Sequence, residues 1–351
     1  MVILTAASSL YGTVARWRRR WYAGDPDRQR RLSRPVVSVG NLCAGGSGKT
    51  PVVEALARLL IAHGERPAIL TRGYARRRAP DGVTVVSDGA RILAGLDAAG
   101  DEPLMLARAL PGVPVLVSPD RYLAGCLAER RFGATVHLLD DGFQHLALAR
   151  DVDLLLAVED DVTDRLLPAG RLREPLGAAA AADALLTVAA GDGAERLRRA
   201  LRVETAFHVR RALRPPRWVN TGCDGPVPSA GVVFAVAAVA RPQRFFDDLA
   251  VAGWHVAGTT VFRDHHRFTG LDVTRIVRAS AAAGARVVLT TDKDAVRFGA
   301  CDIRHLPLAA VPLGVTIEPE TEFCQWLIAR IRTRPPAPQQ PPGPGPWPTS
   351  R

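Results

Sequence analysis

The sequence predicts an α/β protein: a P-loop-type parallel sheet with helices on both faces (an α/β/α sandwich) and a second, smaller α/β domain. Short apolar runs alternate with helical segments, which is typical of a parallel sheet covered on both faces. A glycine-rich turn at 43–50 separates the first strand from the first helix of that sheet. The alternation breaks near 206–228 and then resumes, which indicates a second unit.

The first unit is expected over residues 23–205. Its first strand leads through the glycine-rich turn into a helix from Thr50 to His63, and Gly64 ends that helix. Six apolar runs have the length and composition of buried strands. They are Val36–Val39, Ala68–Thr71, Val113–Val117, Val136–Leu139, Leu154–Val158 and Ala184–Val188.

A linker over 206–228 leads to the second unit, which is expected over 229–333. Residues 334–351 are mostly proline, glycine and glutamine and are expected to form a disordered tail. The elements of the second unit, in order, are a strand at Val232–Val236, a helix from Pro242, a strand at Val256–Val261, a helix from Asp272 and a strand at Val287–Thr291.

Composition narrows the class of protein. The chain has 351 residues, of which 47% are hydrophobic, enough for a large core. The net charge of +11 favours anionic ligands, namely nucleic acid, phospholipid headgroups or phosphorylated substrates, without choosing among them. Five scattered cysteines argue for a reducing compartment and against a disulfide framework or a zinc site. No run approaches the roughly 20 apolar residues that span a bilayer.

Residues 1–22 predict a basic amphipathic helix at a membrane surface. Leu10, Val14, Trp17 and Trp21 fall on one helical face, with arginines beside and opposite it. Tryptophan with arginine is the combination typical of an anionic membrane interface. The alternative is a helix that packs on its own domain with solvated arginines.

The turn at 43–50 has the composition of a phosphate-binding loop. Backbone N–H groups and a helix N-terminus bind polyphosphate, Lys49 adds a full charge, and Thr50 can place its hydroxyl on Mg²⁺. Cys43 stands where the pattern has glycine, and the bland alternative is a glycine-rich turn without ligand. The nucleotide-binding residues are expected to be Cys43, Ala44, Gly45, Gly46, Ser47, Gly48, Lys49 and Thr50.

Polar residues follow three further strands, at the sheet edge where ligands of such folds collect. Asp140 and Asp141 end an apolar run, as in the second acidic element of phosphate-loop enzymes, and a bound metal would relieve their repulsion. The alternative is a helix cap with one solvated acid. The polar clusters are Arg72 to Arg78, Ser118 to Tyr122 and Asp140 to His145.

Other candidates stay open on the residues alone. Asp101 opens a helix, and on the residues alone it is better suited to capping that helix than to acting as a base. His265 and His266 form the only histidine pair, and such pairs are more often structural than catalytic. Arg171 and Arg173 could bind phosphate or could be surface charges.

Eight segments together resemble the tetraacyldisaccharide 4′-kinase family of the lipid A pathway of Gram-negative bacteria, over roughly residues 8–332. They are Ser38-Val39-Gly40-Asn41, the 43–50 loop, Arg72-Gly73-Tyr74, Gly100-Asp101-Glu102-Pro103, Asp140-Asp141-Gly142-Phe143-Gln144-His145, the Pro168–Pro175 segment, Asp264-His265-His266 and Thr291-Asp292-Lys293-Asp294.

The resemblance implies phosphorylation, by ATP with Mg²⁺, of the 4′-hydroxyl of a tetraacyldisaccharide 1-phosphate, which gives lipid IVA. It also implies two α/β/α domains joined by a short β linker, with nucleotide in the cleft. A peripheral location at the cytoplasmic face of the bacterial inner membrane follows. The expected partners are the lipid substrate and an anionic membrane surface, with no nucleic acid and no protein partner.

The resemblance also implies roles for residues. Asp101 would be the base, tuned by a histidine, with His265 preferred to His266. Lys49 would hold the β- and γ-phosphates. Magnesium would lie on Thr50 with Asp140 or Asp141, and Arg72, Tyr74, Arg121, Gln144, Arg171 and Arg173 would contact substrate or nucleotide.

One departure and two competing functions remain. Ala238 and Ala240 stand where relatives are expected to carry glycines, which bears on how closely the second domain approaches the nucleotide. A phosphate-loop GTPase or ATPase is the competing enzyme, but no Asn-Lys-x-Asp guanine motif is present. A basic nucleic-acid or membrane-binding protein is the non-enzymatic alternative.

Overall fold

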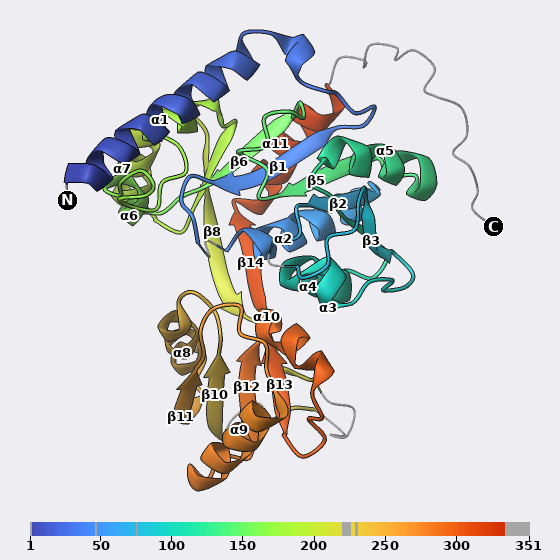
Figure 1. Ribbon diagram of the computed structural model, residues 1–351, viewed down its shortest axis with the longest axis vertical. Helices are drawn as coiled ribbons and strands as arrows, with labels where there is room; N and C mark the ends of the chain where they lie inside the picture. Colours follow the sequence, from blue (N-terminus) through green and yellow to red (C-terminus); the bar gives the residue numbers. More distant parts are fainter. Residues whose placement is uncertain (1, 46–47, 75, 220–225, 229–230, 334–351) are drawn as a thin grey trace.

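Two β-sheets, one large and one small, organise the chain (Figure 1). The computed structural model describes residues 2–45, 48–74, 76–219, 226–228 and 231–333. The expected tail at 334–351 lies outside the described residues, and so does part of the expected linker. Because the chain passes from the first sheet to the second and back, the large sheet contains strands from both ends of the sequence.

The large sheet has the order β14-β8-β7-β6-β1-β5-β2-β4-β3. Its seven central strands, β8 to β4 in that order, are parallel, while the edge strands β3 and β14 are antiparallel to their neighbours. The strands are β1 Val36–Asn41, β2 Pro67–Thr71, β3 Thr84–Asp88, β4 Pro114–Val117, β5 Val136–Asp140, β6 Val152–Leu156, β7 Ala184–Thr187, β8 Ala206–Leu213 and β14 Leu313–Glu318.

Helices cover both faces of this sheet, as the apolar runs require. Val37 and Val39 of β1 face α2, α4 and α11, whereas Val36 faces the α5 side, so successive residues enter opposite cores. The first-domain helices are η1 Pro26–Arg28, α2 Lys49–Ala62, α3 Leu96–Ala99, α4 Asp101–Ala109, α5 Arg121–Phe132, α6 Glu159–Val162, η2 Leu176–Ala181 and α7 Asp192–Leu201.

The small sheet has the order β11-β10-β12-β13-β9, with only β9 antiparallel. Phe245 and Phe246 of α8 pack on one face, and Ile276 of α9 and Phe298 of η3 pack on the other. Its elements are β9 Arg217–Trp218, β10 Val232–Ala237, α8 Pro242–Val251, β11 His255–Val261, α9 Gly270–Ala282, β12 Val287–Thr291, α10 Asp292–Ala295, η3 Val296–Ala300 and β13 Leu308–Val311.

The structure corrects the expected domain limits. Strand β8, expected in the linker 206–228, pairs with β7 and belongs to the large sheet. Strand β14 pairs antiparallel with β8, and α11 (Glu320–Arg332) then returns to the first core with Phe323 and Leu327 fully buried. The second domain therefore ends near 312 instead of 333, because the apolar face of α11 covers the large sheet.

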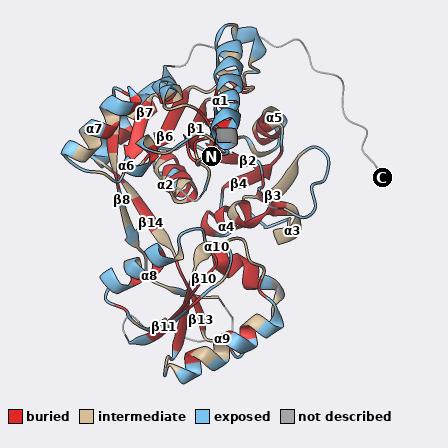
Figure 2. Ribbon diagram, turned by 60° about the vertical axis from the view of Figure 1, so that its left-hand side comes forward, coloured by how far each residue is buried: buried red, intermediate tan, exposed pale blue. Residues whose placement is uncertain are grey.

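Helix α1 (Val2–Ala23) lies on the outside of the first domain and is largely exposed (Figure 2). Its inner side is fixed by polar contacts: the Arg19 guanidinium binds Glu174, with Nε–Oε2 at 2.6 Å, and the Tyr11 hydroxyl donates to the Arg173 carbonyl oxygen at 3.0 Å. Its outer side exposes an apolar stripe, made by Leu10, Val14, Trp17 and Trp21. The helix thus packs on its own domain and still presents the expected apolar face outward.

Candidate active site

The loop at 43–50, expected to bind phosphate, joins the end of β1 to the start of α2. Gly45 and Gly48 have φ of +111° and +82°, which glycine adopts without strain. Lys49 is the first residue of α2, and its ammonium lies 2.9 Å from Asn41 Oδ1 and 3.4 Å from Asp141 Oδ1. Gly46 and Ser47 lie outside the described residues.

The segment that follows α6 supports this loop from behind. The Ala44 N–H donates to the Arg171 carbonyl at 2.7 Å, and the Arg173 N–H donates to the Leu42 carbonyl at 2.7 Å. Cys43 forms a β-bridge with Leu172 and is buried, which raises the pKa of its thiol to about 12. A buried neutral thiol can therefore occupy the position where the motif has glycine.

The two arginines of that segment have different partners. Arg173 makes a two-pronged contact with Asp141, with both N–O distances 2.8 Å, and also binds Asn41. Arg171 pairs with Asp164, with Nε–Oδ2 at 2.6 Å. Arg173 therefore lies at the acid pair beside Lys49, whereas the guanidinium of Arg171 is engaged within its own segment.

Asp140 and Asp141, adjacent at the end of β5, have opposite electrostatic environments. Burial, together with the charges of Glu102 and Asp141, raises the pKa of Asp140 to about 7. Burial also acts to raise the pKa of Asp141, but hydrogen bonds from Arg173 and the charge of Lys49 outweigh it and lower this pKa to about 2. Asp141 is thus a paired anion, whereas Asp140 is a buried carboxyl on which burial and neighbouring acids outweigh the charges of Lys49 and Lys293.

Asp140 has the free ligand atom that a metal site needs. Its Oδ1 is buried and has no hydrogen-bond partner among the described residues. An unpaired buried carboxylate oxygen is costly, and a bound cation would satisfy it. No group of three or more His, Cys, Asp and Glu side chains in the described ranges is arranged to hold a metal. Mg²⁺ commonly takes only one or two carboxylates, with phosphate and water as its other ligands, so these residues fit it.

Asp101 and His265 meet across the junction of the two domains. Asp101 is the first residue of α4, and its Oδ2 lies 2.8 Å from His265 Nδ1. Burial acts to raise the pKa of Asp101, but the hydrogen bond from His265 and the charge of Arg297 lower it below its ordinary value. Asp101 is therefore a buried carboxylate kept ionised by donors from the second domain.

His266 has a different environment from His265. Its Nε2 lies 3.0 Å from Asp272 Oδ2, and its ring stacks on Phe262 with centroids 4.7 Å apart. These contacts hold the start of α9 and the β11–α9 loop. Of the two histidines, only His265 therefore reaches Asp101, as preferred from the sequence.

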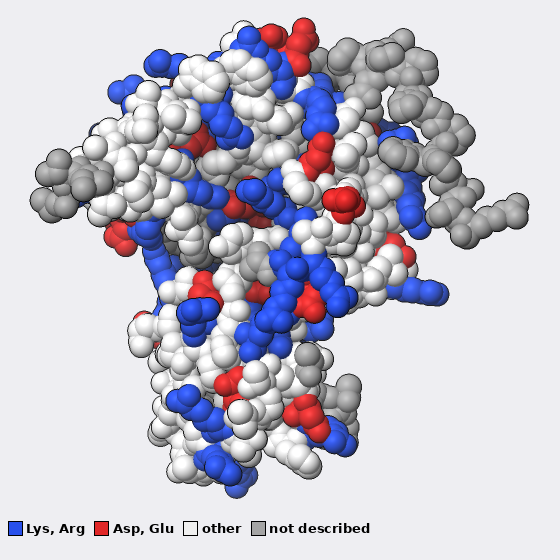
Figure 3. Space-filling model, viewed as in Figure 1, with Lys and Arg blue, Asp and Glu red and all other residues white. Residues whose placement is uncertain are grey.

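The expected substrate residues lie along the same sheet edge. Burial and the charge of Arg72 lower the pKa of Arg121 to about 10, so these two cations share a site. Tyr74 is exposed, and its ring lies 5.5 Å from the ring of His265. Gln144 donates to the Asn41 carbonyl at 3.0 Å while its Oε1 is buried without a partner in the described chain. Figure 3 shows Lys and Arg side chains gathered where the domains meet.

Several residues at this site were not expected as site residues from the sequence. Asn41 binds Lys49 and Arg173, Lys293 binds Glu102 at 3.0 Å, and Arg297 binds Asp101. For Asn41 and Lys293 the only signal was that they belong to the Ser-Val-Gly-Asn and Thr-Asp-Lys-Asp segments. Arg297 lies outside both segments, and no pattern in the sequence pointed to it.

Ala238, where glycine was expected, is fully buried beneath these contacts. Its N–H donates to Asp294 Oδ2 at 2.9 Å, and its carbonyl accepts from Arg297 at 2.8 Å. Ala240, by contrast, is exposed. Both backbone polar groups of Ala238 are thus hydrogen-bonded to side chains of the second domain itself.

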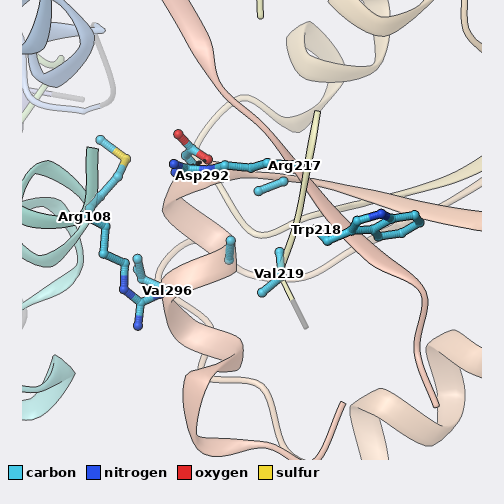
Figure 4. A pocket seen from close by; sticks show the side chains of 9 residues that line it. Arg108, Arg217, Trp218, Val219, Asp292 and Val296 are labelled. Carbon is cyan, nitrogen blue, oxygen red and sulfur yellow. Dashed lines mark hydrogen bonds and ion pairs between the residues drawn. The ribbon is translucent and has the colours of Figure 1, made fainter. Parts of the chain in front are cut away.

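A separate cavity of about 220 Å³ lies at the domain junction (Figure 4). Arg108 and Met105 of α4 contribute to one side, and Arg217, paired with Asp292 at 3.0 Å, contributes to another. None of the expected site residues that the structure describes lines it. It is lined by Met105, Arg108, Arg217, Trp218, Val219, Asp292, Ala295, Val296 and Ala310.

The fold and the site together define a P-loop phosphotransferase with an inserted second α/β domain. A family model described as tetraacyldisaccharide-1-P 4′-kinase matches residues 1–332. The chain belongs to this family, and it is therefore a kinase of lipid A synthesis.

Known proteins agree with this placement over most of the chain. A tetraacyldisaccharide 4′-kinase from Desulfotalea psychrophila is 38% identical over 333 residues, which cover 92% of this chain and 94% of that protein. One from Geobacter metallireducens is 40% identical over 310 residues, covering 85% and 89%. The crystal structure of "apo" form LpxK from Aquifex aeolicus in complex with ATP has a TM-score of 0.74 and 33% identity, covering 93% and 98%.

Within the described residues, no helix is long and apolar enough to cross a membrane.

Proposed function

We propose that this chain transfers the γ-phosphoryl group of ATP to the 4′-hydroxyl of a tetraacyldisaccharide 1-phosphate, with Asp101 as the base. The observation that carries this proposal is the contact between Asp101 Oδ2 and His265 Nδ1 at 2.8 Å. Glu102, next to Asp101, and Lys293 both act electrostatically on the carboxyl of Asp140, so the base and the acid pair belong to one site.

In this mechanism Asp101 accepts the proton of the sugar hydroxyl as the hydroxyl oxygen attacks the γ-phosphorus of ATP. The bond from the γ-phosphorus to the β–γ bridging oxygen breaks, and ADP leaves with that electron pair. His265 orients the carboxylate through Nδ1–H. A positioned base contributes about 10²- to 10⁴-fold, and alignment with charge neutralisation supplies the larger part of phosphoryl transfer catalysis. Lys49 neutralises charge on the β- and γ-phosphates, and the backbone N–H groups of the loop hold them.

Thr50 and Asp140 would hold Mg²⁺, with Asp141 beside them. When bound, the cation neutralises charge on the phosphate oxygens. Asp140 is the stronger candidate for a direct ligand because its Oδ1 is unpaired, whereas both oxygens of Asp141 are bound by Arg173. Arg72 and Arg121 would then bind a phosphate of the substrate or nucleotide, because these two cations repel one another and an anion between them would relieve it.

The test uses purified protein, γ-labelled ATP, Mg²⁺ and the lipid disaccharide 1-phosphate. Label should appear in the lipid, and Lys49→Ala should nearly abolish this transfer. Asp101→Asn should lower kcat by about 10²-fold or more while leaving ATP binding unchanged, because a base acts in the transition state. Near-normal kcat in Asp101→Asn would remove the base assignment, and release of phosphate without labelled lipid would favour a phosphate-loop ATPase.

The apolar stripe of α1 supports a further part of the proposal, attachment to an anionic membrane surface. Such a stripe with flanking arginines suits a lipid interface, where the acyl chains of the substrate reside. The chain would then act as a peripheral protein at the cytoplasmic face of the inner membrane, where ATP is available.

A further inference from the structure

Arg297 is a fully buried arginine that lies between the two domains. Among the described residues whose side chains are fully buried, Arg297 is the largest by volume. It reaches from η3 of the second domain to Asp101 of the first, with Arg297 Nε 2.6 Å from Asp101 Oδ2. A buried guanidinium is tolerated only when it is paired and hydrogen-bonded, so its partners fix its position.

The second domain holds Arg297 rigidly from behind. Arg297 Nη1 donates to Asp294 Oδ1 and to the Ala238 carbonyl oxygen, both at 2.8 Å. Asp294 is itself held through Oδ2 by the Thr291 hydroxyl and the Ala238 N–H, each at 2.9 Å. Thr291 and Asp294 belong to the Thr-Asp-Lys-Asp segment. Part of that segment therefore serves to hold Arg297 in place.

The contacts at Asp101 are one-sided. Every hydrogen bond that the described residues make to its carboxylate ends on Oδ2, from Arg297 Nε and from His265 Nδ1. Arg297 Nη2 also contacts this oxygen and lies 3.4 Å from His265 Nδ1. The other oxygen, Oδ1, is therefore the one left for an incoming hydroxyl.

We infer that Arg297 is a positioning residue for the base: from the second domain it binds one oxygen of Asp101, and thereby orients the other oxygen toward the sugar hydroxyl. This inference rests on the proposed function. It makes the docking of the second domain a condition for catalysis, because Arg297 and His265 both come from that domain.

The charges around Asp101 come from several elements. His265 on the β11–α9 loop and Arg297 on η3 face it directly, Asp294 on α10 shares Arg297, and Glu102 on α4 is its neighbour and pairs with Lys293 on α10. Since Arg297 carries the one permanent positive charge in direct contact with Asp101 in the described structure, its removal should make protonation of the carboxylate easier.

The experiment measures lipid phosphorylation against pH for Arg297→Met and Arg297→Lys. In Arg297→Met, kcat should fall by about 10²-fold with the KM for ATP changed by less than about threefold, and the acid limb of kcat/KM should move up by about one pH unit or more. In Arg297→Lys both the loss of kcat and the shift of the acid limb should be smaller. Lysine restores the positive charge but cannot place two nitrogens on Asp101 Oδ2 as arginine does.

Two further variants separate positioning from folding. Arg297→Met leaves Asp294 unpaired, so the double variant Asp294→Asn/Arg297→Met removes both buried charges and guards against misfolding. Asp97→Asn removes a different ion pair across the same junction, that with Arg267, without touching Asp101. It should leave the acid limb in place.

The outcomes decide the inference. A folded Asp294→Asn/Arg297→Met protein with the wild-type acid limb and kcat would overturn it. So would a fall in kcat that Asp97→Asn reproduces without any shift of the acid limb, since Arg297 would then only join the domains. Absence of labelled lipid with the wild-type protein would instead reject the proposed function itself, so the two failures are distinguishable.

Discussion

Asp141 and His265 share a strained backbone conformation, with φ of +58° and +60°. Among the described non-glycine residues only Arg202, which caps α7, has a comparable φ. Such conformations cost about 1–3 kcal/mol each and persist where surrounding contacts impose them. Here the two-pronged contact from Arg173 and the hydrogen bond to Asp101 impose them. Both strained residues lie in the proposed site, which is where such strain is commonly found.

His145 gives a prediction on stability against pH. Burial, with the nearby charges of Arg121 and Arg150, lowers the pKa of His145 to about 3. The unfolded chain takes up this proton near pH 6.5 and the folded protein does not, so His145 removes stability as pH falls from about 6.5 toward 3. Between pH 7 and pH 5 the His145→Gln variant should lose less unfolding free energy than wild type, by on the order of 2 kcal/mol.

Urea unfolding at pH 7, 6 and 5 measures this difference. His255→Gln, at an exposed histidine of β11, is the control and should follow the wild-type curve. Parallel curves for His145→Gln and wild type would show that His145 is protonated in the folded protein.

Gly40 gives a prediction on packing beside the site. A Cβ at this position of β1 would lie 2.4 Å from Phe143 Cβ and 2.8 Å from the Phe143 backbone nitrogen. Backbone atoms cannot yield cheaply, so Gly40→Ala should lower the unfolding free energy by about 1–3 kcal/mol and reduce kcat. Gly177→Ala, where nothing lies within 4 Å, is the matched control. Equal thermal stability of the two variants would contradict the prediction.

At the scale of elements, α1 packs on its own domain and still exposes the apolar stripe that a membrane surface would require. Arg19 and Tyr11 fix it to the segment that supports the phosphate-binding loop, while its apolar stripe stays exposed. A membrane-bound α1 would therefore hold the active site at a set distance from the lipid surface.

The double variant Val14→Ser/Trp17→Ser tests the outer face alone. Each residue is more than half exposed, at 54% and 64%, so the fold should be unaffected. Sedimentation with vesicles of anionic phospholipid should weaken by about tenfold or more, because two apolar side chains no longer enter the interface. Leu271→Ser, at an 84% exposed residue of α9, is the control. Unchanged sedimentation of the double variant would refute the attachment.

Elements with strong local signals were predictable from the sequence. The loop at 43–50, the parallel strands around it and α2 follow from apolar runs and glycine spacing that are local in the chain. Edge strand β3 and the short strand β9 were not expected, because they gain their partners only from distant residues, such as Val85 with Leu116. The same holds for Arg297, whose partner Asp101 lies 196 residues away.

At the scale of the whole molecule, the first domain is discontinuous in sequence. Helix α11 follows the second domain and yet buries Phe323 in the first core, where its ring packs edge-on to Phe207 with centroids 4.9 Å apart. No periodicity in the sequence could assign α11 to one core or the other, since an apolar helix face is the same in both cases.

Phe323→Ala should therefore destabilise the first domain, by about 3–5 kcal/mol. The reason is the cavity left in a core that also holds the helix following the phosphate-binding loop. Thermal unfolding in the presence and absence of ATP measures it, and Glu322→Ala, at the exposed neighbour, is the control. If Phe323→Ala melted like Glu322→Ala, α11 would contribute little to this core.

The antiparallel pairing of β8 with β14 has a practical consequence. Leu213 and Leu313 are directly opposed, so the chain leaves and re-enters the large sheet at neighbouring points. A tight hairpin turn in place of residues 214–312 would bridge these points without distorting either strand. The second domain is thus an insertion between two adjacent strand ends and could be deleted. Engineering could then give a shorter chain that keeps the 43–50 loop but lacks His265 and Arg297.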